Sequence, residues 1–115
     1  NRPIYLQIIE EIRKRAVRGA YPPGEKLPSV REMALQMGVN PNTIARAYSE
    51  LEREAFVFRR RGQGSYVTET PERVETERER LADAAVQRFV TEIRELGLNA
   101  QQVTHLLGEI KEALS

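Results

Sequence analysis

Apolar residues recur at intervals of three and four along two short neighbouring stretches of the chain, and this spacing predicts two amphipathic helices. The apolar positions are Val30, Met33, Ala34 and Met37 in the first stretch and Ile44, Ala47, Tyr48 and Leu51 in the second. Each helix therefore has one face for a hydrophobic core and an opposite face that is free for another role.

The residues around these stretches supply start and stop signals for both helices. Ser29 is a good N-cap, and Glu32 follows at the spacing of a capping box, in which each side chain bonds the backbone N–H of the other residue. Gly38 ends the first helix, because glycine takes the left-handed conformation without a Cβ penalty. Asn40 caps the second helix, whose first residue is Pro41. The turn is so short that the helices must cross steeply, which predicts a helix-turn-helix.

The outward face of the second helix carries Asn42, Thr43 and Arg46. These side chains can hydrogen-bond base edges or phosphates, and an arginine can bind guanine through two hydrogen bonds. In DNA-binding proteins a helix-turn-helix places its second helix in the major groove. The alternative is an ordinary solvated helix face, which this segment taken alone does not exclude.

An earlier helix is predicted to begin within residues 2–6, with Pro3 in its first turn, and to end at Gly19. Its apolar stripe consists of Ile4, Ile8, Ile9, Ile12 and Ala16. We expect this helix to be the floor on which the helix-turn-helix packs. Residues 20–26 contain two prolines and a glycine and therefore form a turn. Lys26 lies just before the capping box, where a phosphate would approach a helix N-terminus.

Residues 56–61 and 65–68 are rich in residues typical of β-strands, and the Gly-Gln-Gly sequence at 62–64 separates them, which predicts a β-hairpin. A helix-turn-helix followed by a hairpin is a winged helix. The arginines at 59–61 precede a turn whose glycines let the backbone lie against a crowded surface, which fits contact with the DNA minor groove and its phosphates. The alternative is an edge hairpin that the arginines protect from aggregation.

A boundary is predicted at Thr70 and Pro71, after which the chain becomes a two-helix tail. The first tail helix begins with a very polar stretch that we expect to bridge solvent, and Gly97 ends it. Asn99 caps the second tail helix together with Gln102. The apolar stripes consist of Val74, Leu81, Ala85, Phe89, Ile93 and Leu96 in the first helix and Val103, Leu106, Leu107, Ile110 and Leu114 in the second.

Two helices of this length cannot bury both stripes against each other, because units below roughly 40–50 residues are marginal without further support. Pairing with a second copy would supply that support, so we predict a homodimer. The predicted dimerisation residues are Leu81, Ala85, Phe89, Ile93, Val103, Leu106, Leu107 and Ile110. The expected fold class is thus mainly α with a small β-hairpin: a winged helix-turn-helix DNA-binding domain over residues 1–70, followed by a helical dimerisation tail over residues 71–115.

Charge is unevenly distributed along the 115 residues. Residues 1–70 hold 12 Lys and Arg against 8 Asp and Glu, a net charge of +4, whereas residues 71–115 hold 6 against 9, a net charge of −3. This asymmetry indicates that only the front half meets a polyanion, although ordinary surface scatter is the alternative. The chain has no cysteine and no apolar run long enough to cross a membrane, so we expect a soluble cytoplasmic protein without a membrane partner.

Two rival classes of function carry less support from the residues. For an enzyme, the chain has one histidine and no grouped set of histidines and carboxylates, so no catalytic residue is assigned. His105 and Glu109 share a helix face, but a closed metal site needs about three or four ligands, so we expect no metal and no cofactor. For a winged helix that binds protein or RNA, the three wing arginines are unnecessary, and the few aromatic residues lie at core-like positions.

With these elements in place, the sequence resembles the GntR family of bacterial transcription regulators. The matching residues are Pro3-Ile4-Tyr5, residues 23–32, residues 38–43, Ala47-Tyr48, Leu51-Glu52 and residues 61–67. The short two-helix tail resembles the YtrA subfamily in length and helix count, and members of that subfamily are small repressors that dimerise through the tail.

The resemblance implies a sequence-specific transcriptional regulator, a repressor that binds an inverted-repeat operator in double-stranded DNA as a homodimer and controls a transporter operon. It implies that Arg31 contacts the DNA backbone, that Arg46 and its neighbours lie on the recognition helix, and that Gly64 enters the minor groove. The predicted DNA-binding residues are Lys26, Ser29, Arg31, Asn40, Asn42, Thr43, Arg46, Arg60, Arg61, Gln63 and Gly64. An effector stays unidentified, since two tail helices enclose little volume for a small molecule.

Two residues depart from the family pattern. Ala45 stands where many relatives outside this subfamily have an arginine, which moves the base-reading guanidinium to Arg46. Ala55 stands where a glycine usually ends the recognition helix. We therefore expect that helix either to overrun or to end with mild backbone strain.

Overall fold

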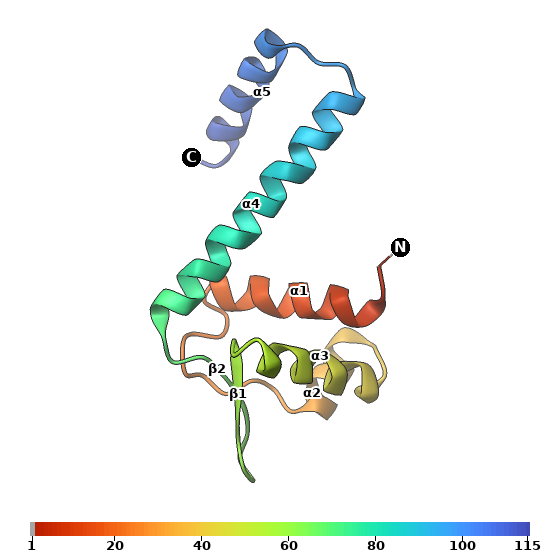
Figure 1. The fold of residues 1–115 in the computed structure, drawn as a ribbon, viewed down its shortest axis with the longest axis vertical. Coiled ribbons are helices and arrows are strands. Elements are labelled where there is room, and N and C mark those ends of the chain that lie inside the picture. The colour runs from red at the N-terminus through yellow and green to blue at the C-terminus, as the bar shows by residue number, and fades with distance from the viewer. Residues whose placement is uncertain (1) are drawn as a thin grey trace. The chain divides into compact units, whose positions relative to one another are not determined.

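The computed structural model describes residues 2–115 as five helices and one two-stranded antiparallel sheet (Figure 1). In chain order these are α1 (Ile4–Val17), α2 (Val30–Met37), α3 (Pro41–Arg53), β1 (Val57–Arg60), β2 (Gly64–Val67), α4 (Pro71–Glu95) and α5 (Ala100–Ala113). The predicted fold class, mainly α with a β-hairpin, is confirmed. The chain divides into two compact units, one up to Arg80 and one from Leu81 to Ser115. The assignment of DNA binding to residues 1–70 and of dimerisation to residues 71–115 stays a prediction.

The helix-turn-helix forms where the sequence predicts it because both of its helices are capped. Ser29 Oγ accepts a hydrogen bond from the backbone N–H of Glu32 at 3.1 Å, and the backbone N–H of Ser29 donates to the Glu32 carboxylate at 2.9 Å. Gly38 ends α2 in the left-handed conformation, with φ of 65°. Asn40 Oδ1 accepts from the backbone N–H of Asn42 at 2.7 Å and so caps α3. All these predicted signals are confirmed.

One hydrophobic core joins α1, α2, α3, the hairpin and the start of α4 in the first unit. Its buried residues are Ile8, Ile9, Ile12, Ala16, Leu27, Met33, Ala34, Ile44, Ala47, Tyr48, Leu51, Phe56, Val57, Val67 and Val74. The predicted core face of α3 is fully buried, and α1 packs against α3 as expected. Ile4 differs from the other residues of the predicted apolar stripe, because it is 53% exposed. As the first residue of α1, it lies beyond the edge of the core, beside the N-terminal part of α3.

The predicted wing is present, and it gains a third strand-like segment. β1 and β2 pair in antiparallel register, with Val57 opposite Val67 and Arg60 opposite Gly64. The other edge of β2 is covered by the chain before α2, because residues 25–27 exchange backbone hydrogen bonds of 2.8 and 2.9 Å with it. The wing is therefore anchored to the helix-turn-helix through the loop that carries Lys26.

Ala55 ends the recognition helix in a strained conformation. Helix α3 stops at Arg53, and Ala55 follows with φ of 63°, the one left-handed non-glycine residue among residues 2–115. The backbone N–H of Phe56 then donates to the carbonyl of Leu51 at 3.1 Å and closes the helix end. Of the two outcomes expected from alanine at this position, the structure adopts the strained end.

The start of α4 belongs to the core of the first unit. Val74 is 6% exposed and Glu77 is 1% exposed, so the expectation that this polar stretch bridges solvent is wrong. The sequence pattern misled because Glu77 stands one helical turn after Val74 on the face that packs inward. A carboxylate can occupy such a position only where cations compensate for its lost hydration.

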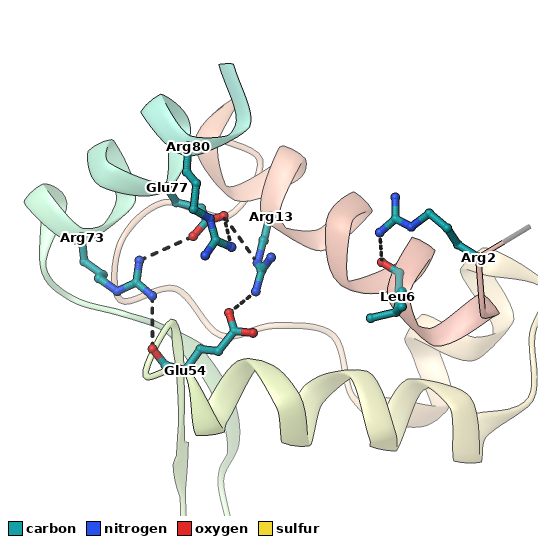
Figure 2. A network of polar contacts seen from close by, with 7 residues as sticks. All are labelled: Arg2, Leu6, Arg13, Glu54, Arg73, Glu77 and Arg80. Carbon is teal, nitrogen blue, oxygen red and sulfur yellow. Dashed lines mark hydrogen bonds and ion pairs between the residues drawn. The ribbon is translucent and has the colours of Figure 1, made fainter. Parts of the chain in front are cut away.

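Three guanidinium groups surround the buried carboxylate of Glu77 (Figure 2). Arg80 lies 3.1 Å from it, and Arg13 and Arg73 each lie 3.5 Å from it. Arg13 also pairs with the carboxylate of Glu54, and Arg73 donates to the backbone carbonyl of Glu54 at 3.1 Å. The network therefore ties α4 to α1 and to the C-terminal end of α3.

The second unit contains the end of α4 and all of α5. Gly97 separates the helices with φ of 70°, and Asn99 and Gln102 form the predicted capping box, with both hydrogen bonds at 2.9 Å. None of the residues 81–115 is buried. Within residues 2–115, no helix has the combination of length and hydrophobicity that crossing a membrane requires.

We expect Ala55→Gly to raise the free energy of unfolding by about 1 kcal/mol, because glycine adopts the left-handed conformation without steric cost. The alanine side chain is exposed, so no packing is lost. Urea unfolding followed by circular dichroism measures the change. The matched control is Ala45→Gly in the middle of α3, which should lower the free energy of unfolding by up to about 1 kcal/mol. A lower stability for Ala55→Gly would show that the position is not strained.

We expect Glu77→Gln to lower the free energy of unfolding by about 2 kcal/mol, because three arginines lose the charge that compensates them while Arg13 and Arg73 remain partly buried. Thermal and urea unfolding of the full chain measure this. Glu79→Gln makes the same change at an exposed position of α4 and should stay within about 0.5 kcal/mol of the parent. Equal effects of the two substitutions would contradict a structural role for the network.

Candidate nucleic-acid interface

The outward face of α3 presents polar side chains beside the N-terminus of α1. Asn42 and Arg46 are exposed and Thr43 is half-buried, on the side opposite the buried residues of the helix. Together with Ile4 and Tyr5 they line a hollow of about 340 Å³. The guanidinium carbon of Arg46 lies 3.7 Å from the centroid of the Tyr5 ring. The structure thus brings the predicted recognition residues together and adds α1 to their surroundings.

A second hollow, of about 260 Å³, lies between the wing and the N-terminus of α2. Its lining includes four of the predicted DNA-binding residues, namely Lys26, Ser29, Gln63 and Gly64. Arg59 and Tyr48 also line it, and the Tyr48 hydroxyl donates to the backbone carbonyl of Pro28 at 2.6 Å. The predicted residues Arg31, Asn40 and Arg61 are exposed but line neither hollow.

The N-terminus of α2 already holds a carboxylate. The backbone N–H of Ser29, then its hydroxyl, and then the charge of Lys26 hold the pKa of Glu32 below its usual range. Glu32 therefore stays ionised well below neutral pH. A phosphate that approaches this helix end would share it with Glu32, so the positive charge of Lys26 is needed to offset the repulsion.

The wing arginines are less free than the sequence suggests. Arg60 pairs with Glu69 at 3.3 Å, and Arg59 pairs with Glu52 at 3.2 Å. The guanidinium of Arg60 also lies 5.1 Å from the centroid of the Tyr66 ring. Because both ion pairs are exposed, each is weak, and a phosphate can compete for the arginine. Sequence reasoning missed these acidic partners, because nothing in the spacing of residues 52 and 69 points to the wing.

Four of the predicted cationic residues form no ion pair at contact distance within residues 2–115. These residues are Lys26, Arg31, Arg46 and Arg61. They come from the loop before α2, from α2, from α3 and from the wing turn, so the helix-turn-helix, the loop before it and the wing all contribute available positive charge. This distribution suits a polyanion that contacts the helix-turn-helix and the wing together.

Gly64 has a structural requirement of its own. Its φ is 116°, a conformation that side-chain-bearing residues rarely adopt. A Cβ at this position would also lie 3.0 Å from Cε of Lys26. Part of the reason for glycine here is thus the packing of the wing against the loop before α2, in addition to the predicted close approach of DNA.

The predicted dimerisation residues form no core within the second unit. Leu81, Phe89, Ile93, Val103 and Leu106 are half-buried, and Ala85, Leu107 and Ile110 are exposed. Val86, which sequence reasoning missed, is 55% exposed, and Leu96 and Leu114 are 72% and 82% exposed. The second unit taken alone therefore leaves large apolar side chains on both of its helices exposed.

His105 and Glu109 form an exposed pair on α5, with Nε2 and Oε1 2.9 Å apart. Within the described residues, no group of three or more histidines, cysteines and carboxylates gathers around this pair or elsewhere. The pair therefore has the geometry of an ordinary helix-surface contact.

A comparison with protein families finds a match that covers most of the first unit. The sequence model for bacterial regulatory proteins of the gntR family matches residues 4–67. The chain is 48% identical over 103 residues to the uncharacterised HTH-type transcriptional regulator YhcF of Bacillus subtilis, which covers 90% of this chain and 85% of that protein. It is 49% identical over 67 residues to the HTH-type transcriptional repressor YtrA of the same organism, covering 58% of this chain and 52% of that protein.

Solved structures agree with this match. A GntR family transcriptional regulator from Listeria monocytogenes superposes with a TM-score of 0.86 at 38% identity, covering 95% of this chain and 96% of that chain. The DNA-binding domain of AraR, solved in complex with operator ORR3, superposes with a TM-score of 0.55 at 32% identity, covering 57% of this chain and 80% of that chain.

Proposed function

The chain belongs to the GntR family of bacterial regulatory proteins, and from this premise we propose that it represses transcription by binding an inverted-repeat operator as a homodimer. It is a DNA-binding transcriptional regulator and not an enzyme. The proposal that the chain recognises DNA rests on one observation. Asn42, Thr43 and Arg46 lie together on the face of α3 that is opposite its buried residues. The relative YtrA is a transcriptional repressor, which supports repression.

In this proposal Arg46, Asn42 and Thr43 read base edges in the major groove, as an arginine and an asparagine can do through paired hydrogen bonds. The surrounding cations and polar groups bind the phosphates and the minor groove. These are Lys26, Ser29, Arg31 and Asn40 near the helix ends and Arg60, Arg61, Gln63 and Gly64 on the wing. Asn40 keeps an amide N–H₂ to donate, since only its oxygen is used to cap α3.

The homodimer is supported by the exposed apolar side chains of the second unit. A second copy would cover Leu81, Ala85, Phe89, Ile93, Val103, Leu106, Leu107 and Ile110. A two-fold dimer requires two-fold DNA, so the operator should be an inverted repeat with half-sites about one helical turn apart. We further propose that the protein acts in the cytoplasm and, from the resemblance to the YtrA subfamily, that its target is a transporter operon.

Arg46→Ala should weaken binding to the cognate operator by about 1–3 kcal/mol per half-site and relax the preference at one base position in each half-site. The operator is first selected from random duplexes with the parent protein, and affinities are then measured by mobility shift. Arg60→Ala should instead weaken all duplexes alike and reduce the salt dependence by about one unit of slope per half-site.

The matched control is Arg53→Ala, which removes an exposed arginine from the last turn of α3 that pairs with Glu50. It should leave sequence preference unchanged. If Arg46→Ala weakens operator and random DNA equally, the assignment of base reading to Arg46 is wrong. If the parent protein selects no duplex sequence, the proposed function is wrong.

Leu107→Glu should convert the dimer to a monomer, because the residue is 48% exposed in the single chain and the charge would meet its own copy across the two-fold axis. Operator affinity should then fall by about 10²–10⁴, the usual contribution of a second linked contact. Sedimentation measures the mass, and Gln101→Glu, on the opposite face of α5, is the control that should stay dimeric. A Leu107→Glu monomer that binds the full inverted repeat as tightly as the parent would contradict this assignment.

A further inference from the structure

The side chain of Arg46 on α3 rests on an aromatic ring from another helix. Its guanidinium carbon lies 3.7 Å from the centroid of the Tyr5 ring, which is the distance of direct stacking. The other arginines near aromatic rings lie 5.1–5.6 Å from the ring centroids and are not in such close contact. Among the described residues, Arg46 is therefore the arginine in closest contact with an aromatic ring.

Tyr5 is suited to be a fixed platform. It is half-buried and packs against the hydrophobic core, and it stands in the first turn of α1, which packs along α3. The ring thus moves with the core of the winged helix and not with a loop. Tyr5 and Arg46 also line the same hollow at the N-terminal part of α3.

Stacking fixes Arg46 without using its hydrogen-bond donors. The guanidinium N–H groups point outward in the plane of the group, whereas the ring contacts one of its faces. Within residues 2–115 no carboxylate or carbonyl accepts a hydrogen bond from Arg46. The planar fork therefore keeps all its donors available for the O6 and N7 acceptors of a guanine.

We propose that Tyr5 is a positioning residue for sequence recognition: its ring pre-orients the guanidinium of Arg46 so that less side-chain freedom is lost when a base is read. This inference rests on the proposed function, because it assumes that Arg46 reads a base. Its chemical basis is the cost of ordering a long arginine side chain, part of which the stack removes before DNA arrives. Tyr5 would thereby extend the specificity determinants from the recognition helix to α1.

The test compares Tyr5→Leu, which removes the ring, with Tyr5→Phe, which keeps the ring and removes only the hydroxyl. The measured quantity is the affinity ratio between the selected operator and an operator changed at the base pair whose preference Arg46→Ala relaxes. Tyr5→Leu should reduce this ratio about two- to five-fold, and Tyr5→Phe should preserve it. In an Arg46→Ala background, Tyr5→Leu should cause no further loss.

A second measurement uses the same variants and needs no DNA. Proton NMR should show the δ protons of Arg46 shifted upfield by the Tyr5 ring in the parent protein and in Tyr5→Phe, and unshifted in Tyr5→Leu. Thermal unfolding of each variant separates a loss of stability, which would affect all duplexes alike, from a loss of discrimination.

Several results would overturn the inference. They are an unshifted Arg46 in the parent protein, an unchanged affinity ratio in Tyr5→Leu, a Tyr5→Phe loss as large as that of Tyr5→Leu, or a Tyr5→Leu loss that persists without Arg46. The last two would mean that Tyr5 contacts DNA itself. If the parent selects an operator but Arg46→Ala relaxes no base preference, the base-reading role fails and the positioning role fails with it. If the parent selects no operator, the proposed function has failed.

Discussion

The burial of one face of α3 is the constraint on which the rest of the first unit depends. Ile44, Tyr48 and Leu51 on that face are each no more than 2% exposed, and exposing any one of them would cost about 1.5–3 kcal/mol. The helix therefore cannot rotate about its axis. With this face fixed, Asn42 and Arg46 must point outward, so the proposed reading surface is a consequence of core packing.

The same core reaches into α4, and it does so through charge as well as through apolar contact. Glu77 is stable in its buried position because Arg13, Arg73 and Arg80 replace the water that it has lost. Since Arg13 and Arg73 also bind Glu54, one polar network fixes the C-terminal end of α3 and the first turns of α4. A truncation at residue 70 would remove Val74 and Glu77 from the core, and the boundary inferred from the Thr70-Pro71 sequence gives no sign of this.

The sequence predicted the features that depend on residues close together in the chain, namely the helix caps and helix ends. The capping boxes at Ser29 and Asn99 and the helix end at Gly38 depend on residues a few positions apart, so their chemistry can be read directly. Contacts between distant residues could not be predicted this way. The pairing of Arg60 with Glu69, the stacking of Arg46 on Tyr5 and the burial of Glu77 each depend on how the elements pack. For the same reason the sequence indicated which polar residues of the candidate interface face away from the core, but not which of its arginines pair with carboxylates.

The electrostatic state of the candidate interface bears on what the proposed dimer would contribute. Two of the three wing arginines are paired with carboxylates, so binding a phosphate at either one exchanges one ion pair for another, and Glu32 stays ionised at the N-terminus of α2. Such an exchange gains less than the binding of a free cation, because the displaced carboxylate stays near the DNA and repels it. A single winged helix should therefore have modest affinity for any duplex, which also limits binding to random DNA. Joining two such units raises affinity only where both half-sites are present, and specificity then comes from the spacing of the operator as well as from its bases.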